Sequence, residues 1–123
     1  MPAASGGPVP LLHNVDDLTR LLAMDPDRPL LVFKHSTRCP ISAAAYAAFQ
    51  EAVAGGDIAP AQPAVVRVIE DRPFARSLAD RWGVAHQSPQ ALLVAGDRVV
   101  WHASHGAVTR AALAAAVRAA VQG

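Results

Sequence analysis

The chain has 123 residues, of which 52% are hydrophobic and 17% are charged, and its formal net charge at pH 7 is +1. This length and composition predict one folded globular domain with its own core, and they exclude an intrinsically disordered chain. A net charge this close to zero gives no electrostatic basis for binding nucleic acid or an anionic membrane surface. No segment approaches the roughly 20 apolar residues of a membrane span, so we expect no nucleic-acid partner and no membrane partner.

The N-terminal part is expected to be a flexible tail, residues 1–10, followed by a helix. The tail contains three prolines, two glycines and one serine. Asn14 can cap the helix, and Asp25-Pro26 ends it. Three leucines between these points recur at helical spacing, which predicts an apolar face packed on the core.

A β-strand, a helix and a second β-strand are predicted next. Leu30–Phe33 is a run of four apolar residues after a proline, which predicts a buried strand. The alanine-rich run 43–53 predicts a helix that Gly55-Gly56 closes. Ala64–Ile69 is a second nearly continuous apolar run, which is typical of a strand parallel to the first. The connection between two such strands is expected to be right-handed.

The C-terminal half predicts a helix over Pro73–Trp82, a hairpin and a last helix. Gly96-Asp97 lies between two apolar runs, which is typical of a two-residue hairpin loop. Thr109 can cap the last helix, whose apolar stripe is expected to reach Val121. The resulting order of elements predicts an α/β domain over residues 11–123, with a central mixed four-stranded sheet flanked by helices. This order is that of the glutaredoxin-like minimal form of the thioredoxin-like fold.

The only cysteine of the chain, Cys39, lies where the first predicted strand gives way to the alanine-rich helix. Pro40 suits the first helical position because its missing N–H costs nothing there, so Cys39 is expected to be the N-cap. Its sulfur would then face the free backbone N–H groups of Ile41 and Ser42. The partial positive charge of a helix N-terminus lowers the pKa of such thiols from about 8.5 to between about 3.5 and 7.5, which favours the reactive thiolate.

The surroundings of Cys39 favour a nucleophile over a structural residue. His35 and Arg38 can add positive potential near the thiol. The alternative is a buried cysteine that serves as a small apolar side chain. Ser42 completes the spacing of the redox C-x-x-C motif with a serine in the second position. Because the chain has no other cysteine, such a site must pass its mixed disulfide to a second molecule.

The segment around Cys39 also carries a family resemblance. Lys34–Ser42 resembles the active-site signature of the YtxJ-type monothiol bacilliredoxins, which are thioredoxin-like proteins. Three further segments match the family in order, namely Glu70–Pro73, Gly83–Gln90 and Trp101–His105. Arg38 stands where a threonine is expected, and Gln87 stands where an acidic residue is expected. Neither departure removes the nucleophile.

The resemblance implies an enzyme, a thiol-disulfide oxidoreductase that uses Cys39 to remove bacillithiol from mixed disulfides on other proteins. Its partners would be bacillithiolated client proteins, a low-molecular-weight thiol and a recycling reductase, with bacillithiol as co-substrate and no bound cofactor. The alternatives are a non-catalytic binding module or thiol redox sensor that uses Cys39, and an exchanger specific for glutathione. The single free cysteine, and an N-terminus without a signal-peptide pattern, favour a cytoplasmic location.

The resemblance further assigns a role to Ser88-Pro89. In thioredoxin-like proteins a cis proline at this place faces the active-site cysteine, and the backbone of Ser88 would pair with an extended client strand beside Cys39. From the residues alone, an ordinary trans proline that opens a strand is the alternative. Ser42 is expected to form a hydrogen bond with the sulfur of Cys39.

No metal site is expected. His35 and Cys39 are four residues apart and His102 and His105 are three apart, but the two pairs lie on separate segments. Zinc needs three or four convergent protein ligands. The chain also lacks the Gly-rich phosphate loop and the serine-nucleophile motif of other enzyme classes.

Overall fold

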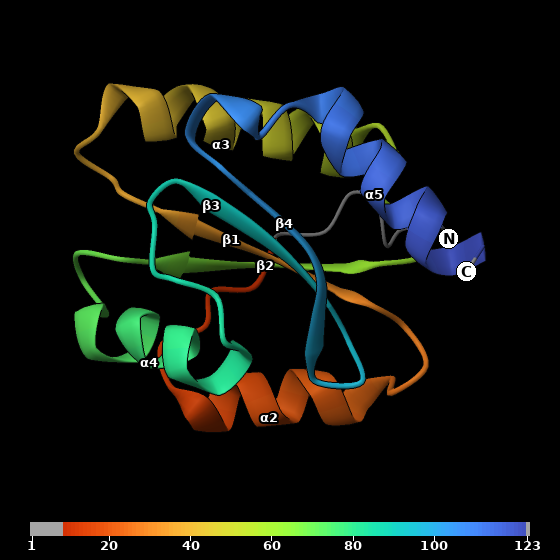
Figure 1. The fold of residues 1–123 in the computed structure, drawn as a ribbon, viewed down its shortest axis with the longest axis horizontal. Coiled ribbons are helices and arrows are strands. Elements are labelled where there is room, and N and C mark those ends of the chain that lie inside the picture. Colours follow the sequence, from red (N-terminus) through yellow and green to blue (C-terminus); the bar gives the residue numbers. More distant parts are fainter. Residues whose placement is uncertain (1–8, 123) are drawn as a thin grey trace.

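The computed structural model describes residues 9–122, so residues 1–8 of the predicted tail and residue 123 lie outside the described residues. The chain forms one four-stranded sheet with helices on both faces (Figure 1). In chain order the elements are α2 (Val15–Met24), β1 (Leu30–His35), α3 (Pro40–Ala54), β2 (Gln62–Arg67), α4 (Arg72–Trp82), β3 (Gln90–Ala95), β4 (Arg98–Ser104), the 3-10 turn η1 (His105–Ala107) and α5 (Arg110–Gln122). Within residues 9–122, no helix combines the length and the apolar character needed to span a membrane.

The sheet has the strand order β2-β1-β3-β4, with β1 parallel to β2 and antiparallel to β3, and with β3 antiparallel to β4. The predicted mixed sheet is therefore confirmed. The second strand lies two residues earlier than predicted, because its pairing with β1 runs from Leu30 opposite Gln62 to His35 opposite Arg67. Pro63 is tolerated inside β2 because this strand lies at the edge of the sheet.

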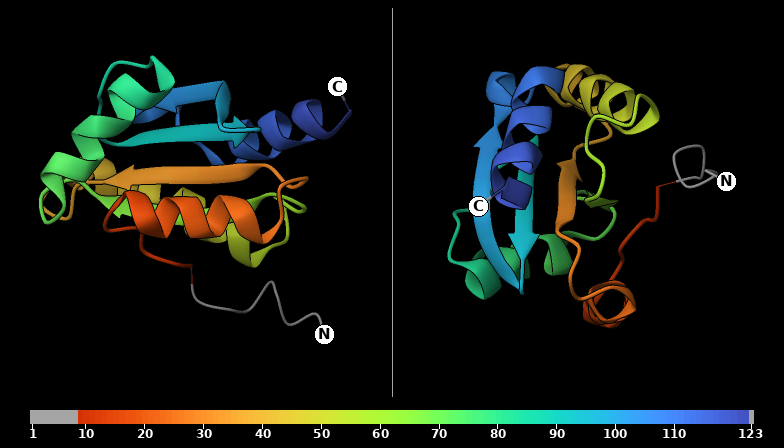
Figure 2. Two further views of the ribbon diagram at one scale, coloured as in Figure 1. Left: turned by 90° about the horizontal axis from the view of Figure 1, so that it is seen from below. Right: turned by 90° about the vertical axis from the view of Figure 1, so that its right-hand side faces the viewer.

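Two helical layers enclose the sheet, with α3 and α5 on one face and α2 and α4 on the other (Figures 1 and 2). Successive side chains of β1 alternate between the two layers. Phe33 packs with Phe49 in the layer of α3 and α5, whereas Val32 packs with Leu18 and Leu78 in the layer of α2 and α4. Each face of the sheet is thus buried under its own apolar cluster, which is the arrangement that an α/β domain requires.

The ends of several elements follow from local sequence, as predicted. The side-chain oxygen of Asn14 accepts a hydrogen bond from the backbone N–H of Asp17 at 2.9 Å and caps α2. Gly96 and Asp97 have positive φ values of 59° and 58°, which are the backbone angles of a two-residue type I′ hairpin turn. The Thr109 hydroxyl accepts a backbone N–H of the first turn of α5 at 3.1 Å.

Val121 corrects the expected apolar stripe of the last helix. This side chain is 51% exposed, although Leu113 and Val117 are buried. Each residue turns an α-helix by about 100°, so two steps of four residues rotate a side chain by about 80° from its starting direction. Ala120 instead packs against the core at this end of α5.

Candidate functional site

Cys39 is the N-cap of α3, as predicted. Its backbone is extended, with φ −110° and ψ 123°, and its carbonyl accepts a hydrogen bond from the N–H of Ala43 at 2.9 Å. Pro40 occupies the first helical position, and the short loop that starts at Ser36 joins β1 to Cys39. The side chain is a free thiol and is partly exposed. The one sulfhydryl of the chain therefore lies at the start of a helix and is open to a reacting partner.

The hydrogen bonds expected for the sulfur are not formed. Within residues 9–122, the side chain of Cys39 caps no backbone N–H of α3. Ser42 is completely buried, and its Oγ accepts the backbone N–H of Ser36 at 2.9 Å and pairs with His35 Nδ1 at 2.7 Å. A buried hydroxyl needs such partners, and here the loop supplies them. Ser42 therefore ties the loop before Cys39 to the helix after it and does not bond the sulfur.

His35 is held as an uncharged ring, which corrects the expectation that it adds positive potential. Burial lowers the pKa of His35 below its ordinary value, and the opposing effect of the Glu70 carboxylate does not reverse this. An imidazole with a lowered pKa is neutral at pH 7. Its ring stacks on Tyr46 with centroids 4.3 Å apart, and Tyr46 also packs against the core around Phe33. Tyr46 thus belongs to the core face of α3 and also contacts a neighbour of Cys39.

Arg38 is exposed next to Cys39, and within the described part of the chain it forms no ion pair. The loop before it is connected to the turn between β2 and α4 through Thr37, whose Oγ1 donates to Glu70 Oε2 at 3.1 Å. Ile41, the second residue of α3, is 57% exposed. These side chains form an open rim around the start of α3.

The peptide bond between Ser88 and Pro89 is cis, as the resemblance implied. Pro89 is buried just before β3, and its carbonyl accepts the backbone N–H of His105 at 2.9 Å. The hydroxyl of Ser88 is buried, and no residue within 9–122 supplies a hydrogen-bond partner for it. The structure brings Ser88 and Cys39 together in one pocket, although 48 residues of chain lie between them.

This polar pocket has a volume of about 270 Å³. It lies where the loop before Cys39 meets α4 and the segment before β3. Its lining residues are Ser36, Cys39, Val68, Ile69, Arg72, Arg76, His86 and Ser88.

Sequence reasoning did not select Arg72, Arg76 or His86 as site residues. Two weak signals were available, because Arg72 and His86 fall within segments that match the family and the two arginines lie four residues apart on one helix face. Which face of α4 turns toward Cys39 depends on how this helix packs against β2. Such a contact between distant segments cannot be obtained from local spacing.

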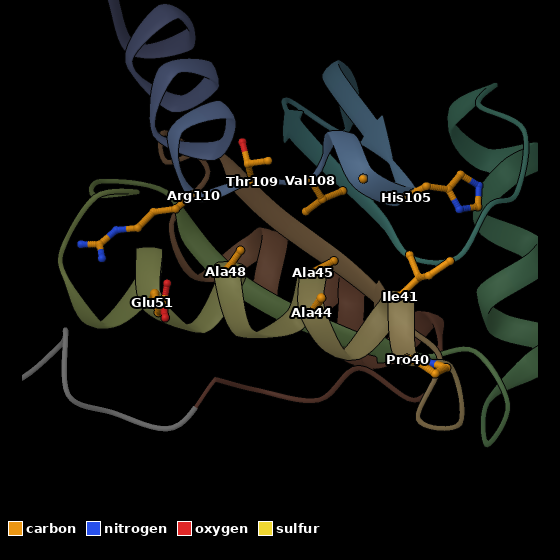
Figure 3. A pocket seen from close by; sticks show the side chains of 11 residues that line it. Pro40, Ile41, Ala44, Ala45, Ala48, Glu51, His105, Val108, Thr109 and Arg110 are labelled. Atoms are coloured by element: carbon orange, nitrogen blue, oxygen red, sulfur yellow. The ribbon is translucent and has the colours of Figure 1, made fainter.

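A second, apolar hollow of about 610 Å³ lies along the other side of α3, toward η1 and α5 (Figure 3). Ile41, Ala44 and Ala48 line it from α3, and His105 and Val108 line it from the opposite wall. Cys39 is not among its lining residues. The larger of the two hollows is therefore not the one that contains the thiol.

His105 is bonded to Gln87, with Nε2 and Oε1 3.0 Å apart, and it has a positive φ of 55°. This contact connects the turn after β4 to the segment before β3. In the described range 9–122, no three His, Cys, Asp or Glu side chains gather closely enough to hold a metal ion.

Comparison with known proteins agrees with this geometry. The model of a family described as monothiol bacilliredoxin BrxC matches residues 11–113. A solved structure described as having a thioredoxin fold is 28% identical and has a TM-score of 0.80, covering 91% of this chain and 96% of that chain. Thioredoxin from Trypanosoma brucei brucei is 12% identical with a TM-score of 0.75, covering 100% of this chain and 98% of its own. Thioredoxin from Fasciola hepatica is 18% identical with a TM-score of 0.71, covering 90% and 98%.

The likeness to the two thioredoxins shows the fold, so the predicted thioredoxin-like α/β architecture is confirmed. The family match covers most of the chain and includes the segment around Cys39. Family and fold together indicate a thiol oxidoreductase-like protein.

Proposed function

The chain belongs to the monothiol bacilliredoxin family, and we propose that it removes bacillithiol from mixed disulfides on client proteins. The observation that carries this proposal is the placement of Cys39. The only cysteine of the chain is partly exposed at the start of α3 and shares a pocket with Ser88. A thiol in this setting can attack a disulfide of another molecule, but it cannot form a second disulfide within its own chain.

In the first step, the thiolate of Cys39 attacks the bacillithiol sulfur of the client's mixed disulfide. The bond between client and bacillithiol breaks, the client cysteine leaves as a thiolate, and a new S–S bond joins Cys39 to bacillithiol. In the second step, a bacillithiol thiolate or the thiolate of a reductase attacks the bacillithiol sulfur, and Cys39 leaves as a thiolate. With bacillithiol as the second reactant, the products are bacillithiol disulfide and the regenerated protein.

The residues around the thiol have distinct proposed roles. The backbone of Ser88, held before the buried Pro89, pairs with an extended segment of the client beside Cys39. Ser42 and His35 are positioning residues, because their hydrogen bond fixes the loop that precedes the thiol. Arg38 supplies positive charge at the open rim. A thiol that must be regenerated by small thiols needs a reducing compartment, so we place the reaction in the cytoplasm.

The test uses a client protein that carries bacillithiol on one cysteine. Incubation with the reduced protein and excess bacillithiol is expected to remove the bacillithiol mass from the client. Cys39→Ser is expected to abolish this removal, while its free energy of unfolding stays close to that of the wild type. Removal of bacillithiol by the Cys39→Ser variant at the wild-type rate would contradict the proposal. Client binding without removal would instead favour a non-catalytic binding module.

A further inference from the structure

The polar pocket is surrounded by cations that have no carboxylate partner. Arg72 and Arg76 line it from α4. Lys34 of β1, only 1% exposed, does not line the pocket, but its charge acts on the lining residue His86. Within residues 9–122, no carboxylate lies at ion-pair distance from any of these three groups. Four other arginines each pair with an aspartate, namely Arg20, Arg28, Arg81 and Arg110. Four arginines outside the pocket also form no ion pair within the described residues, so the pocket is distinguished by two unpaired arginines close to a buried lysine.

The positive charges act together at the pocket. Burial, with the nearby charges of Lys34, Arg76 and Arg72, lowers the pKa of His86 below its ordinary value. Burial and the charge of Arg76 lower the pKa of Lys34 to about 8. The nearest side-chain partner of Lys34 is the neutral amide of Gln90, whose Oε1 accepts from Nζ at 3.2 Å. A site with this potential favours a bound anion.

Two polar atoms at the pocket are buried and unpartnered within the described residues, namely Ser88 Oγ and His86 Nδ1. A buried polar group without a hydrogen bond costs about 1–3 kcal/mol, so such atoms are rare in native proteins. A hydroxyl donates readily to a carboxylate oxygen, and a neutral imidazole can donate from one of its two nitrogens. The same ligand that neutralises the arginines can therefore also satisfy these two atoms.

The size and position of the pocket indicate what carries this anion. A volume of about 270 Å³ accommodates a small molecule or a single side chain. Cys39 is one of the lining residues, so a group bound there lies beside the sulfur that undergoes exchange. A small thiol joined to Cys39 by a disulfide can place its own acidic group in the pocket, whereas the bulk of a protein client remains outside.

We propose that the polar pocket binds a carboxylate of the low-molecular-weight thiol during exchange, through ion pairs with Arg72 and Arg76 and a hydrogen bond from Ser88. This inference rests on the proposed function, because the ligand is the thiol that Cys39 exchanges. In the reaction, the Cys39 thiolate attacks one sulfur of a small disulfide, the S–S bond breaks, a Cys39–S bond forms and the other half leaves as a thiolate. The pocket thus selects acidic thiols over neutral and cationic ones.

The test compares three symmetrical disulfides that differ in charge: 3,3′-dithiodipropionate with carboxylates, neutral 2-hydroxyethyl disulfide, and cationic cystamine. The rate at which each adds to Cys39 is followed by intact mass. The double variant Arg72→Gln/Arg76→Gln is expected to react about five- to tenfold more slowly than wild type with the carboxylate disulfide. With the neutral disulfide, the rate of the double variant is expected to stay within about twofold of the wild-type rate. With cystamine, it is expected to equal or exceed the wild-type rate. Added salt is expected to reduce the wild-type advantage with the carboxylate disulfide.

Arg118→Gln is the matched control, since Arg118 is exposed on α5 and forms no ion pair within the described residues. It is expected to leave all three rates unchanged. An equal fall in all three rates of the double variant would overturn the inference, because the arginines would then act on the thiol itself. Unchanged rates would overturn it too. If the wild-type protein reacted with none of the three disulfides, the proposed function itself would be contradicted.

Discussion

The two hollows beside α3 differ in nearly every property except their proximity to its N-terminus. The polar pocket is the smaller, at about 270 Å³, and contains Cys39 and two unpaired arginines. The apolar hollow is more than twice as large, at about 610 Å³, and three alanines, Ile41 and Val108 form the apolar part of its lining (Figure 3). The size of a hollow therefore does not show where the thiol chemistry of this fold takes place. The reacting site is marked instead by unpaired charges and unpartnered polar atoms around the thiol.

The difference originates in the alternation of β1. Phe33 points into the apolar cluster beneath α3 and α5, and the next residue, Lys34, belongs to the opposite face of the sheet. The layer of α3 and α5 therefore remains apolar as far as Phe33, and His35 at the end of the strand stacks on Tyr46 of α3. The layer of α2 and α4 becomes polar there, with Lys34 and Arg76 near one another. Substitutions on the two sides should consequently have separable effects on stability and on thiol chemistry.

The largest effect on stability is expected for Phe49→Ala in the apolar layer. Phe49 is completely buried and stacks on Phe33 with ring centroids 5.2 Å apart. Loss of the ring should reduce the free energy of unfolding by about 3–5 kcal/mol, as urea denaturation would show. Phe49→Leu, which retains much of the apolar volume, should cost less. The reaction rate of Cys39 in the folded fraction should not change, and a proportional fall in that rate would contradict the separation of the two sides.

A smaller loss of stability is expected for Ser42→Ala, because Ser42 connects the loop before Cys39 to α3. The substitution leaves the part-buried N–H of Ser36 and Nδ1 of His35 without their partner. The expected loss is about 1–3 kcal/mol in the free energy of unfolding. Ser77→Ala is the control, because the Ser77 hydroxyl donates only to a carbonyl within its own helix. Equal losses in the two variants would show that Ser42 has no special structural role.

Lys34 gives the polar side a pH dependence. Its pKa is lowered from 10.5 to about 8 in the folded protein, mainly by burial and secondarily by Arg76. Between these values the unfolded chain binds more protons, so the free energy of unfolding should rise with pH, by up to about 1.4 kcal/mol per pH unit. Urea denaturation between about pH 7.5 and 9.5 measures this slope. The rise should be absent in Lys34→Met, and a rise of equal size in that variant would assign it to another group.

The smallest effect is expected for Ala44→Glu in the apolar hollow. Ala44 is exposed on α3 and lines the hollow, whereas Ala47 is exposed on the same helix outside it. Both Ala44→Glu and Ala47→Glu should change the rate of Cys39 with small disulfides by no more than about twofold. If Ala44→Glu alone stopped the reaction, the hollow would be part of the reacting site and the comparison would fail.

Local features of the sequence predicted much of the site. The cap formed by Cys39, the proline after it and the hairpin turn at Gly96 each follow from one or two residues and their backbone preferences. The cis bond before Pro89 followed from the family resemblance. The mixed sheet followed from the order of the elements, with two strands joined by a helix and two by a tight turn, whereas the strand order β2-β1-β3-β4 was first given by the structure.

The remaining features depend on contacts between distant segments. Ser42 could be assigned to the sulfur from its spacing, but the fold places it against His35 and the loop. His35 could be counted as a positive charge only while its burial was unknown. Arg76 lies 37 residues after Cys39, and only the packing of α4 brings it to the same pocket. Charge state and convergence of side chains are tertiary properties, and these were the parts that spacing did not predict.

The most direct test of monothiol exchange at Cys39 is the intact mass of the reduced protein after exposure to bacillithiol disulfide and, in parallel, to glutathione disulfide. The proposal predicts one bacillithiol adduct on Cys39 that added bacillithiol reverses, and slower formation of the glutathione adduct. Absence of an adduct with both disulfides would contradict the proposed exchange and would favour a binding module with the same fold.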